Sequence, residues 1–475
     1  MKELRLTHPI SWLDGIDLRT GKIIQPDHPQ RGESIAGKVL YIPHSIGSTV
    51  GAYIFFSLKK YGTAPLKIVL EEPDSITISA ELAGIPVELK GRRELRLEDP
   101  EVPDEFRRYL EKEASISGAE GFVRVSSVHI SGVSYATIGD AGRKWLEEIK
   151  ERVKFRVLAT TNPLGMDLTK WRDMGIPEGF ASGQLSIVES LLQMGATPSF
   201  TCTPYLVGNL PHFGEHISWG ESSAVAYANS VLGAKTNREG GTKTIVSAAT
   251  GYTSLYGRHL EINRRPDFRV KPPEMEDLSD YYALAFLVGR EYPNAVPVYL
   301  VSGSVPEMKA LSAAGAASGS IEVFHVPGVT PNPLQPVDRE VEVTRSELRG
   351  VYEDLSTFDG GTDLVVLGCP HLSLQEFRTI AQMVNGRKAT TRFWLYTSRA
   401  VLSMVERSGL KNILDRFGAE IWADTCMVVS PLEDMGVRKV TTNSAKAAKY
   451  LKTLRGLEVE FLDLKEILER YSVLR

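Results

Sequence analysis

Short strand-like and helix-like segments alternate along the chain from about residue 104 to the C-terminus. Strands are predicted at Phe122–Ile130, Phe155–Ala159, Val296–Val301, Ile321–His325, Leu364–Leu367 and Arg392–Tyr396. Helices are predicted at Gly142–Lys154, Ser182–Met194, Ser222–Leu232, Asp280–Glu291, Val305–Ala314, Leu374–Val384, Arg399–Ser408 and Ser444–Leu454. This alternation favours an α/β protein whose layers are built on largely parallel sheets.

The first ninety residues form a smaller α/β unit of their own. Its predicted elements are a strand at Lys38–Ile42, a turn-rich loop at Pro43–Gly51, a helix at Ala52–Lys60, a strand at Leu66–Leu70 and a helix at Ser75–Gly84. The charged stretch Gly91–Pro103 carries two prolines, which is typical of an interdomain linker. We therefore expect a small domain at 1–90, a linker at 91–103 and a large region of two or more lobes at 104–475.

The composition excludes several classes of protein. Hydrophobic residues make up 42% and charged residues 24% of the chain, which is typical of a folded globular protein. Because 55 basic and 59 acidic residues give a net charge of −4, the chain lacks the bulk positive charge of a nucleic-acid-binding protein. It also has no run of about 18 apolar residues and no apolar signal core. We expect a cytoplasmic protein that binds neither nucleic acid nor membrane.

The three cysteines cannot form a disulfide framework, because they are few and odd in number. Cys369 follows a buried strand and precedes a proline, so it lies where ligands gather on parallel sheets. Cys202 follows a β-like stretch, and Cys426 lies close to another strand boundary. An isolated cysteine is most often a small buried hydrophobic residue. Three thiolates with turn-like surroundings would instead suit an iron-sulfur cluster with one open iron.

Ser48 opens a predicted helix within the segment Gly47–Gly51. The simplest interpretation is a helix N-cap, a position that serine often fills. The alternative is that the helix terminus and its backbone amides stabilise the Ser48 anion, so that the side chain acts as a base.

Three other polar loops are candidate binding sites. Ser131–Tyr135 joins a strand to a helix but lacks the spacing of a dinucleotide or phosphate-binding loop. Asn162 follows another strand, where it is either an Asx-turn residue or a substrate donor. Glu221, Ser222, Asn237 and Arg238 flank one predicted helix, where they could converge on a polar ligand.

Two catalytic patterns are present only in weak form. His212–His216 reads H-x-x-E-H, but the zinc site needs a helix, and Pro211 and Gly214 oppose one, so we favour structural histidines. The segment Gly132–Ala136 resembles a G-x-S-x-G elbow but ends in alanine, which disfavours an α/β-hydrolase. For His44, His129 and His371, a hydrogen-bonded structural role is also favoured.

Together these segments resemble aconitase X, a branch of the aconitase superfamily of iron-sulfur hydro-lyases. The N-terminal matches are His8–Trp12, Gly37–Leu40, Gly47–Gly51 and Ala83–Pro86, which are similar to the small swivel domain. The matches to the large catalytic part are Ser131–Tyr135, Thr161–Pro163, Thr201–Tyr205, Trp219–Ser222, Thr236–Gly241, Gly368–His371 and Asn443–Lys446. Archaeal members usually keep the two parts as separate subunits, whereas here they are fused.

The resemblance implies a role for each matching residue. Cys202, Cys369 and Cys426 match the ligands of a 4Fe-4S cluster in which one iron has no protein ligand, and Ser48 matches the proton acceptor. The positions that match substrate contacts are Gly132, Val133, Ser134, Asn162, Pro163, Glu221, Ser222 and Lys446. Lys446 or Arg238 would stabilise the Ser48 alkoxide.

The family dehydrates more than one substrate. Archaeal members convert (R)-5-phosphomevalonate to trans-anhydromevalonate 5-phosphate for isoprenoid synthesis by the mevalonate pathway, and certain bacterial members dehydrate cis-3-hydroxy-L-proline. The serine loop at Gly47–Gly51 is more similar to the archaeal version, so phosphomevalonate is favoured. The third candidate activity, less favoured than these two dehydrations, is that of an isomerase that rehydrates its product. The alternative from another class is a ligand-binding homologue without catalysis.

Overall fold

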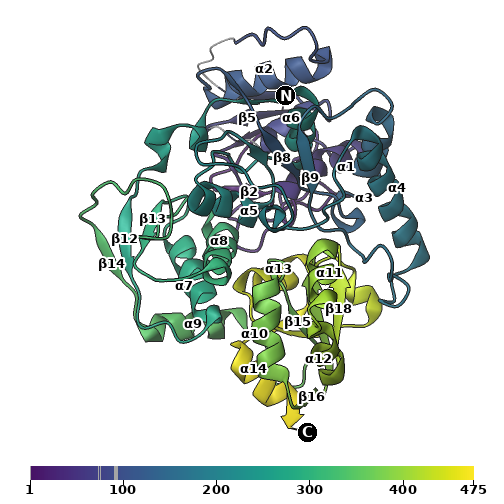
Figure 1. Cartoon of the computed structure of the whole chain (residues 1–475). Coiled ribbons are helices and arrows are strands. Elements are labelled where there is room, and N and C mark those ends of the chain that lie inside the picture. The colour runs from purple at the N-terminus through teal and green to yellow at the C-terminus, as the bar shows by residue number, and fades with distance from the viewer. Residues whose placement is uncertain (1, 73, 75, 90–94, 475) are drawn as a thin grey trace.

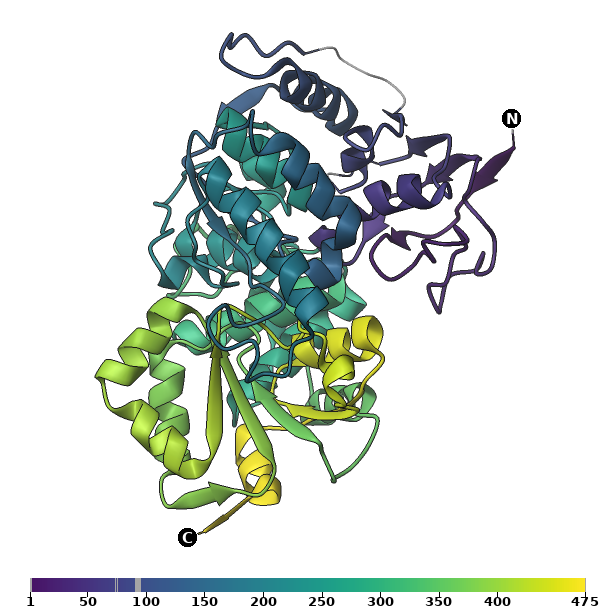
Figure 2. The same cartoon turned by 90° about the vertical axis from the view of Figure 1, so that its right-hand side faces the viewer.

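Parallel sheets covered by helices make up most of the chain, as the alternating sequence pattern predicted. The computed structural model describes residues 2–72, 74, 76–89 and 95–474. We divide these into an N-terminal lobe (to residue 89), a second lobe (104–264), a third lobe (268–355) and a C-terminal lobe (364–474). Figures 1 and 2 show the C-terminal lobe in yellow-green at one end of the molecule, with the purple N-terminal lobe against the second lobe.

The N-terminal lobe is built on a parallel sheet of order β1-β3-β5-β6. Its elements are β1 (Glu3–Arg5), β2 (Ile10–Ser11), β3 (Val39–Ile42), β4 (Ser45–Ile46), the 3₁₀ helix η1 (Thr49–Tyr53), α1 (Ile54–Tyr61), β5 (Lys67–Leu70), the 3₁₀ helix η2 (Thr77–Glu81) and β6 (Val87–Leu89). Both predicted strands are confirmed. The helix predicted at Ala52–Lys60 starts earlier, as η1, and the one predicted from Ser75 is the short η2; Ser75 itself lies outside the described residues.

The described part of the predicted linker, 95–103, packs against the helix that follows it. Leu97 and Val102 are buried. Arg107 donates hydrogen bonds to the backbone carbonyls of Leu97, Asp99 and Val102. Residues 91–94 lie outside the described part of the chain.

The second lobe has a parallel sheet of order β10-β8-β9. Its elements are α2 (Asp104–Ser117), β7 (Phe122–Arg124), β8 (Ser127–Ile130), α3 (Tyr135–Ile149), β9 (Leu158–Thr161), α4 (Glu178–Met194), η3 (Pro204–Leu206), β10 (Ser218–Trp219), α5 (Ser222–Tyr227), the π-helix η4 (Ala228–Leu232), α6 (Gly241–Thr250), β11 (Tyr252–Ser254), η5 (Gly257–His259) and η6 (Glu261–Arg264). The single strand predicted at 122–130 is two strands, because β7 pairs antiparallel with β11 while β8 joins the parallel sheet.

The third lobe has a parallel sheet of order β13-β12-β14. Its elements are β12 (Phe268–Lys271), α7 (Leu278–Glu291), β13 (Pro297–Tyr299), α8 (Val305–Gly319), β14 (Glu340–Glu342) and α9 (Arg345–Leu355). The strand predicted at Ile321–His325 is wrong: only His325 forms an isolated bridge, to Val298. The backbone groups of this segment form hydrogen bonds with side chains instead of a neighbouring strand. Ser230 accepts from the Phe324 amide, and Asn229 donates to the Glu322 carbonyl.

The C-terminal lobe has a parallel sheet of order β18-β17-β15-β19-β20. Its elements are β15 (Leu364–Leu367), α10 (Leu374–Val384), β16 (Arg387–Ala389), β17 (Arg392–Thr397), α11 (Arg399–Arg407), α12 (Leu410–Phe417), β18 (Ala419–Ala423), η7 (Leu432–Met435), β19 (Lys439–Thr442), α13 (Ala445–Arg455), β20 (Glu458–Phe461), α14 (Leu464–Tyr471) and β21 (Ser472–Leu474). The predicted strands and helices of this lobe are confirmed to within a residue or two.

Hydrophobic packing joins the lobes. One core cluster runs continuously from the N-terminal lobe into the second lobe, through residues such as Trp12, Tyr53 and Trp145. Another cluster spans the second, third and C-terminal lobes and includes Cys369 and Cys426. Within the described residues, no helix is both long enough and apolar enough to cross a membrane.

Candidate active site

The polar loops predicted from the sequence follow strands of two parallel sheets. In the second lobe, Ser131, Asn162 and Glu221 come soon after β8, β9 and β10. In the C-terminal lobe, Cys369 follows β15 and Cys426 follows β18. Because the carboxyl ends of parallel strands lie on the same side of their sheet, the loops of each lobe gather there. The contacts described below bring the loops of the second lobe against those of the C-terminal lobe.

The three cysteines lie in one buried region. All three are buried, and interaction between the Cys369 and Cys426 thiols lowers the pKa of Cys369 and raises the pKa of Cys426. Cys202 also raises the pKa of Cys426 through its charge. Burial raises the pKa of Cys202 to about 12. The β-like stretch predicted before Cys202 is not a strand: residues 195–201 are irregular and are held to β9 through the Thr201 amide and the Thr161 carbonyl.

His371 connects the loops of all three cysteines. Its backbone amide donates to the Cys202 sulfur over 3.2 Å. Its Nδ1 lies 2.9 Å from the Thr201 hydroxyl, and its Nε2 lies 2.7 Å from the Thr425 carbonyl, next to Cys426. Burial lowers the pKa of His371 to about 4. The structural role predicted for this histidine is therefore confirmed, although the sequence did not reveal which loops it joins.

These residues fit an iron-sulfur cluster. The sulfurs of Cys202 and Cys426 each accept a backbone N–H, from His371 and Val428, and such bonds stabilise thiolate ligands. No three His, Cys, Asp or Glu side chains in the described chain surround one point where a single metal ion would sit. A cluster has a different requirement, because each thiolate binds a separate iron, so three buried thiols are the donor set that such a cluster would use.

An ion pair connects the second and C-terminal lobes beside the cysteines. The Lys446 ammonium group contacts the Glu221 carboxylate and lies 3.2 Å from the Ser223 hydroxyl. Asn162 donates to the other Glu221 oxygen over 3.1 Å. Burial by itself would raise the pKa of Glu221, but the charge of Lys446 and these hydrogen bonds lower it to about 2. The site therefore holds a fixed carboxylate and a fixed ammonium group.

The loop after β8 touches both neighbouring lobes. Ser134 donates to the Val429 carbonyl over 3.0 Å, three residues from Cys426. A Cβ at Gly132, whose φ is +71°, would lie 2.5 Å from the Tyr53 ring of the N-terminal lobe. Val133 is buried, and its carbonyl accepts from Gln184 over 2.8 Å. Only glycine allows Tyr53 to pack against the loop in this way.

Ser48 caps the helix that follows it, as the simplest interpretation predicted. Its Oγ accepts from the Val50 amide over 3.4 Å at the start of η1. The loop docks onto the second lobe on both sides of Ser48. Arg238 donates to the Gly47 carbonyl over 2.6 Å, and Thr49 donates to Ser131 over 3.2 Å. Ser48 therefore lies next to the loop that carries Gly132 and Ser134.

The remaining predicted residues have clear positions. Ser222 is buried at the first turn of α5, and Pro163 precedes Leu164, whose amide donates to the Asp424 carbonyl near Cys426. Arg238 contacts the N-terminal lobe, and its role in substrate binding stays a prediction. Asn237 donates to the Tyr256 carbonyl and accepts from the Arg258 amide.

The H-x-x-E-H segment is a loop, as expected from its proline and glycine. His212 is exposed and pairs with Glu215, three residues away. His216 instead stacks on His259, with their Nδ1 atoms 2.9 Å apart. The two histidines of the pattern therefore have separate partners.

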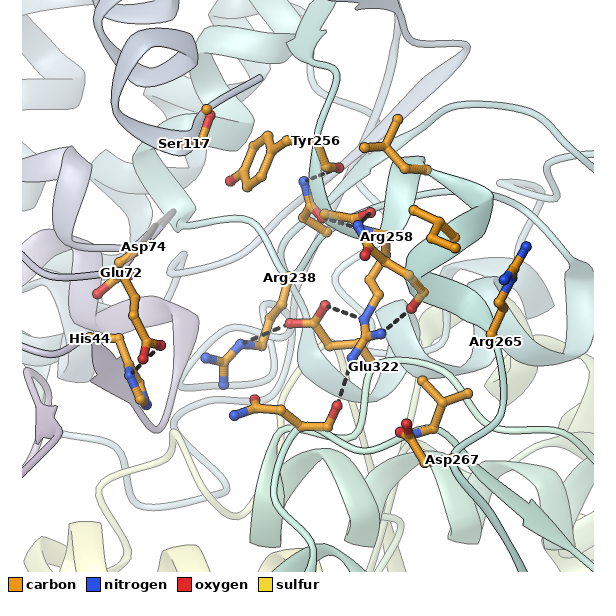
Figure 3. A pocket seen from close by; sticks show the side chains of 18 of the residues that line it. His44, Glu72, Asp74, Ser117, Arg238, Tyr256, Arg258, Arg265, Asp267 and Glu322 are labelled. Carbon is orange, nitrogen blue, oxygen red and sulfur yellow. Dashed lines mark hydrogen bonds and ion pairs between the residues drawn. The ribbon is translucent and has the colours of Figure 1, made fainter. Parts of the chain in front are cut away.

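A cleft of about 820 Å³ opens beside the Ser48 loop. Figure 3 shows its two walls, with His44, Glu72 and Asp74 on one side and Arg238, Arg258 and Glu322 on the other. Glu322 lies 3.9 Å from Arg238 and 3.6 Å from Arg258, so charged groups of the second and third lobes face the N-terminal lobe here.

The comparisons with known proteins identify the family. Models of the aconitase X swivel, first, second and third domains match residues 2–97, 95–262, 266–353 and 362–472. The chain belongs to the aconitase X family. It is similar to the crystal structure of aconitase X from Thermococcus kodakaraensis (holo-form), with a TM-score of 0.72 and 34% identity over 77% of this chain and 94% of that one.

The relatives are named for two different substrates. The phosphomevalonate dehydratase large subunit of Methanothermobacter thermautotrophicus is 42% identical over 80% of this chain and 98% of its own length. The cis-3-hydroxy-L-proline dehydratase of Pseudomonas aeruginosa is 32% identical over 97% of this chain and 92% of its own. The phosphomevalonate dehydratase small subunit of Pyrococcus abyssi is 48% identical over 17% of this chain and 62% of its own. These relatives support a dehydratase of the aconitase X family.

Proposed function

We propose that the protein dehydrates (R)-5-phosphomevalonate to trans-anhydromevalonate 5-phosphate, using a 4Fe-4S cluster held by Cys202, Cys369 and Cys426. The observation that carries the proposal is a continuous set of contacts beside three buried cysteines. The Ser48 loop docks on the turn that begins at Ser131, Ser134 of the same turn contacts the Cys426 loop, and the ion pair of Lys446 and Glu221 acts on Cys202. This combination suits removal of a proton and a hydroxyl group from an anionic substrate.

The protein's residues would bind and orient the substrate. Lys446 supplies a buried positive charge, and Asn162 and Ser134 add hydrogen-bonding groups on the loops beside it. Backbone amides of the Gly132–Ser134 turn add further donors for an anionic group. The N-terminal lobe covers this turn through Tyr53, which would help to exclude water.

Ser48 would act as the general base. Its Oγ would take the proton from the carbon next to the substrate carboxylate. A serine anion is costly near neutral pH, and the Val50 amide and the nearby Arg238 guanidinium both favour it. When bound, a 4Fe-4S cluster with one iron free of protein ligands supplies a Lewis acid for departure of the hydroxyl group.

The substrate assignment is supported by the relatives. The large-subunit phosphomevalonate dehydratases reach 42% identity, against 32% for the cis-3-hydroxy-L-proline dehydratase. One observation favours the second substrate: the hydroxyproline dehydratase aligns over 97% of this chain, so it extends across the N-terminal lobe as well. Dehydration of cis-3-hydroxy-L-proline is therefore the second candidate.

An anaerobic assay of the reconstituted protein with both substrates side by side tests the proposal. We expect phosphomevalonate to lose one water, detected by mass spectrometry, and hydroxyproline to stay unchanged. Turnover of hydroxyproline alone would reverse the two candidates. A protein that binds no iron or sulfide after anaerobic reconstitution, with all three cysteines reduced, would overturn the cluster assignment.

A further inference from the structure

We propose that Asp74 is a positioning residue that fixes the loop carrying Ser48. The inference rests on the proposed function, in which Ser48 is the base. Asp74 lies between strand β5 and helix η2 of the N-terminal lobe and is 9% exposed. It is part of the wall of the cleft in Figure 3 that faces Arg238 and Glu322.

Asp74 gathers hydrogen bonds from two segments of the chain. One oxygen, Oδ1, accepts from the Ile76 amide, the Thr77 amide and the Ser45 hydroxyl, at 2.9, 3.1 and 3.0 Å. The other oxygen, Oδ2, accepts from the Ser45 amide and the Thr77 hydroxyl, each at 2.6 Å. The Trp12 indole donates to the same Thr77 hydroxyl over 2.7 Å. Asp74 therefore ties the start of the Ser48 loop to the turn that precedes η2.

The position of Ser48 follows from this anchor. Ser45 belongs to β4, which pairs with β2, and only two residues separate it from Ser48. Gly47, with φ of +90°, passes so close to Ser11 that a Cβ would lie 2.7 Å from its hydroxyl oxygen. Arg238 and Ser131 hold the other side of the loop from the second lobe. Within the N-terminal lobe, Ser45 donates both its backbone amide and its hydroxyl to Asp74.

A carboxylate suits this position because it has two acceptor oxygens and no donor. In Asp74→Asn, the remaining amide oxygen would accept from the donors now at Oδ1, which are the Ile76 amide, the Thr77 amide and the Ser45 hydroxyl. The asparagine NH₂ group would replace Oδ2 and face two donors, the Ser45 amide and the Thr77 hydroxyl, with nothing to accept from them. Asp74→Asn is therefore expected to free the Ser45 backbone amide, while the bonds at Oδ1 from the Ile76 and Thr77 amides and the Ser45 hydroxyl are kept.

The predicted consequence is selective for the chemical step. The described hydrogen bonds of Asp74 are all within the N-terminal lobe, whereas the proposed substrate-binding groups Asn162, Glu221 and Lys446 belong to the other lobes. Displacement of the base by about 1 Å costs on the order of 10²-fold in rate. Substrate affinity should change little.

The test compares Asp74→Asn with Asp17→Ala in the reconstituted full chain. Asp17 caps another turn of the same lobe, where one oxygen accepts the Thr20 amide and hydroxyl, so each variant loses two hydrogen bonds. The measurements are kcat, KM and the kinetic isotope effect with phosphomevalonate deuterated at the carbon next to the carboxylate. For Asp74→Asn we expect kcat to fall by about 10²-fold, KM to stay nearly constant and the isotope effect to rise, because proton removal becomes rate-limiting.

A merely structural role for Asp74 would give a different pattern. Loss of folded enzyme lowers the apparent kcat but leaves the isotope effect unchanged, and that result would overturn the proposal. If Asp74→Asn does not fold, Ser45→Ala removes the other bond between these two residues, from the Ser45 hydroxyl to Oδ1, and should raise the isotope effect by a smaller amount. Asp17→Ala should leave the isotope effect at the wild-type value.

Amide hydrogen exchange separates this inference from the proposed function. If the wild-type protein does not dehydrate phosphomevalonate, the proposed function fails, but the hold of Asp74 on the loop is still measurable. We expect faster exchange at residues 45–50 in Asp74→Asn and unchanged exchange there in Asp17→Ala. Unchanged exchange in both variants would overturn the positioning role.

Discussion

Lys446 and Glu221 form an ion pair between the C-terminal and second lobes, although 225 residues separate them in the chain. Both side chains lie at the start of a helix, α13 for Lys446 and α5 for Glu221. Both charges also act on Cys202 and Cys369, in addition to burial and, for Cys369, the Cys426 thiol. The contact joins the two parts of the candidate active site.

Removal of Lys446 should destabilise the protein. In Lys446→Met the Glu221 carboxylate loses its partner in a largely buried site, which typically costs about 3–5 kcal/mol. The Lys446→Met/Glu221→Gln double variant should recover part of this loss, because no unpaired charge remains. Denaturant unfolding of the cluster-free proteins measures both effects. A double variant no more stable than Lys446→Met would contradict the ion-pair interpretation.

Replacement of Ser48 by alanine should remove the base and leave the cluster site intact. We expect kcat for phosphomevalonate to fall by about 10²- to 10⁴-fold, the usual contribution of general base catalysis. The visible absorption of the reconstituted cluster should stay at the wild-type level, since the described hydrogen bonds of Ser48 do not reach the cysteine loops. Wild-type activity in Ser48→Ala would end the assignment of this base.

Replacement of Cys369 by serine should impair cluster binding. A serine oxygen is a poorer iron ligand than a thiolate in a site built for sulfur. Iron and sulfide content after anaerobic reconstitution should fall well below the wild-type values, while Ser48→Ala serves as the control that retains both. Full iron and sulfide in Cys369→Ser would show that this cysteine is not a ligand.

Acid should destabilise the protein through its buried histidines. Burial lowers the pKa of His129 to about 4, whereas in the unfolded chain histidine titrates near its ordinary value of 6.5. Between these values the unfolded state binds more protons, so the free energy of unfolding falls as pH drops below about 6.5. At pH 5 this one group should account for a loss of about 2 kcal/mol.

The variant His129→Gln isolates that contribution. Denaturant unfolding at pH 7.5 and pH 5, with wild type and variant in the same cluster-free state, should show a smaller loss of stability for the variant. The imidazole lies 2.9 Å from the Thr160 hydroxyl and 3.3 Å from Asn162, so glutamine keeps a hydrogen-bonding side chain there. Equal losses in the two proteins would contradict a neutral buried His129.

Local sequence patterns predicted the structure correctly where residues adjacent in the sequence determine it. The capping position of Ser48 and the place of Cys369 at the end of β15 follow from a few adjacent residues. The same logic failed at Ile321–His325, where the composition indicates a strand but Asn229 and Ser230 take its backbone hydrogen bonds. That competition depends on side chains more than ninety residues away.

The sequence by itself determined the α/β architecture, the family and the residues to examine, because hydrophobic spacing and short motifs are local properties. Only the tertiary structure decided how those residues meet. It gave Lys446 its partner Glu221, made His371 the link between three cysteine loops, and placed Asp74 under the loop of Ser48. These contacts join segments that are far apart in the sequence and are brought together by tertiary packing. Local sequence patterns therefore cannot predict which of these segments meet.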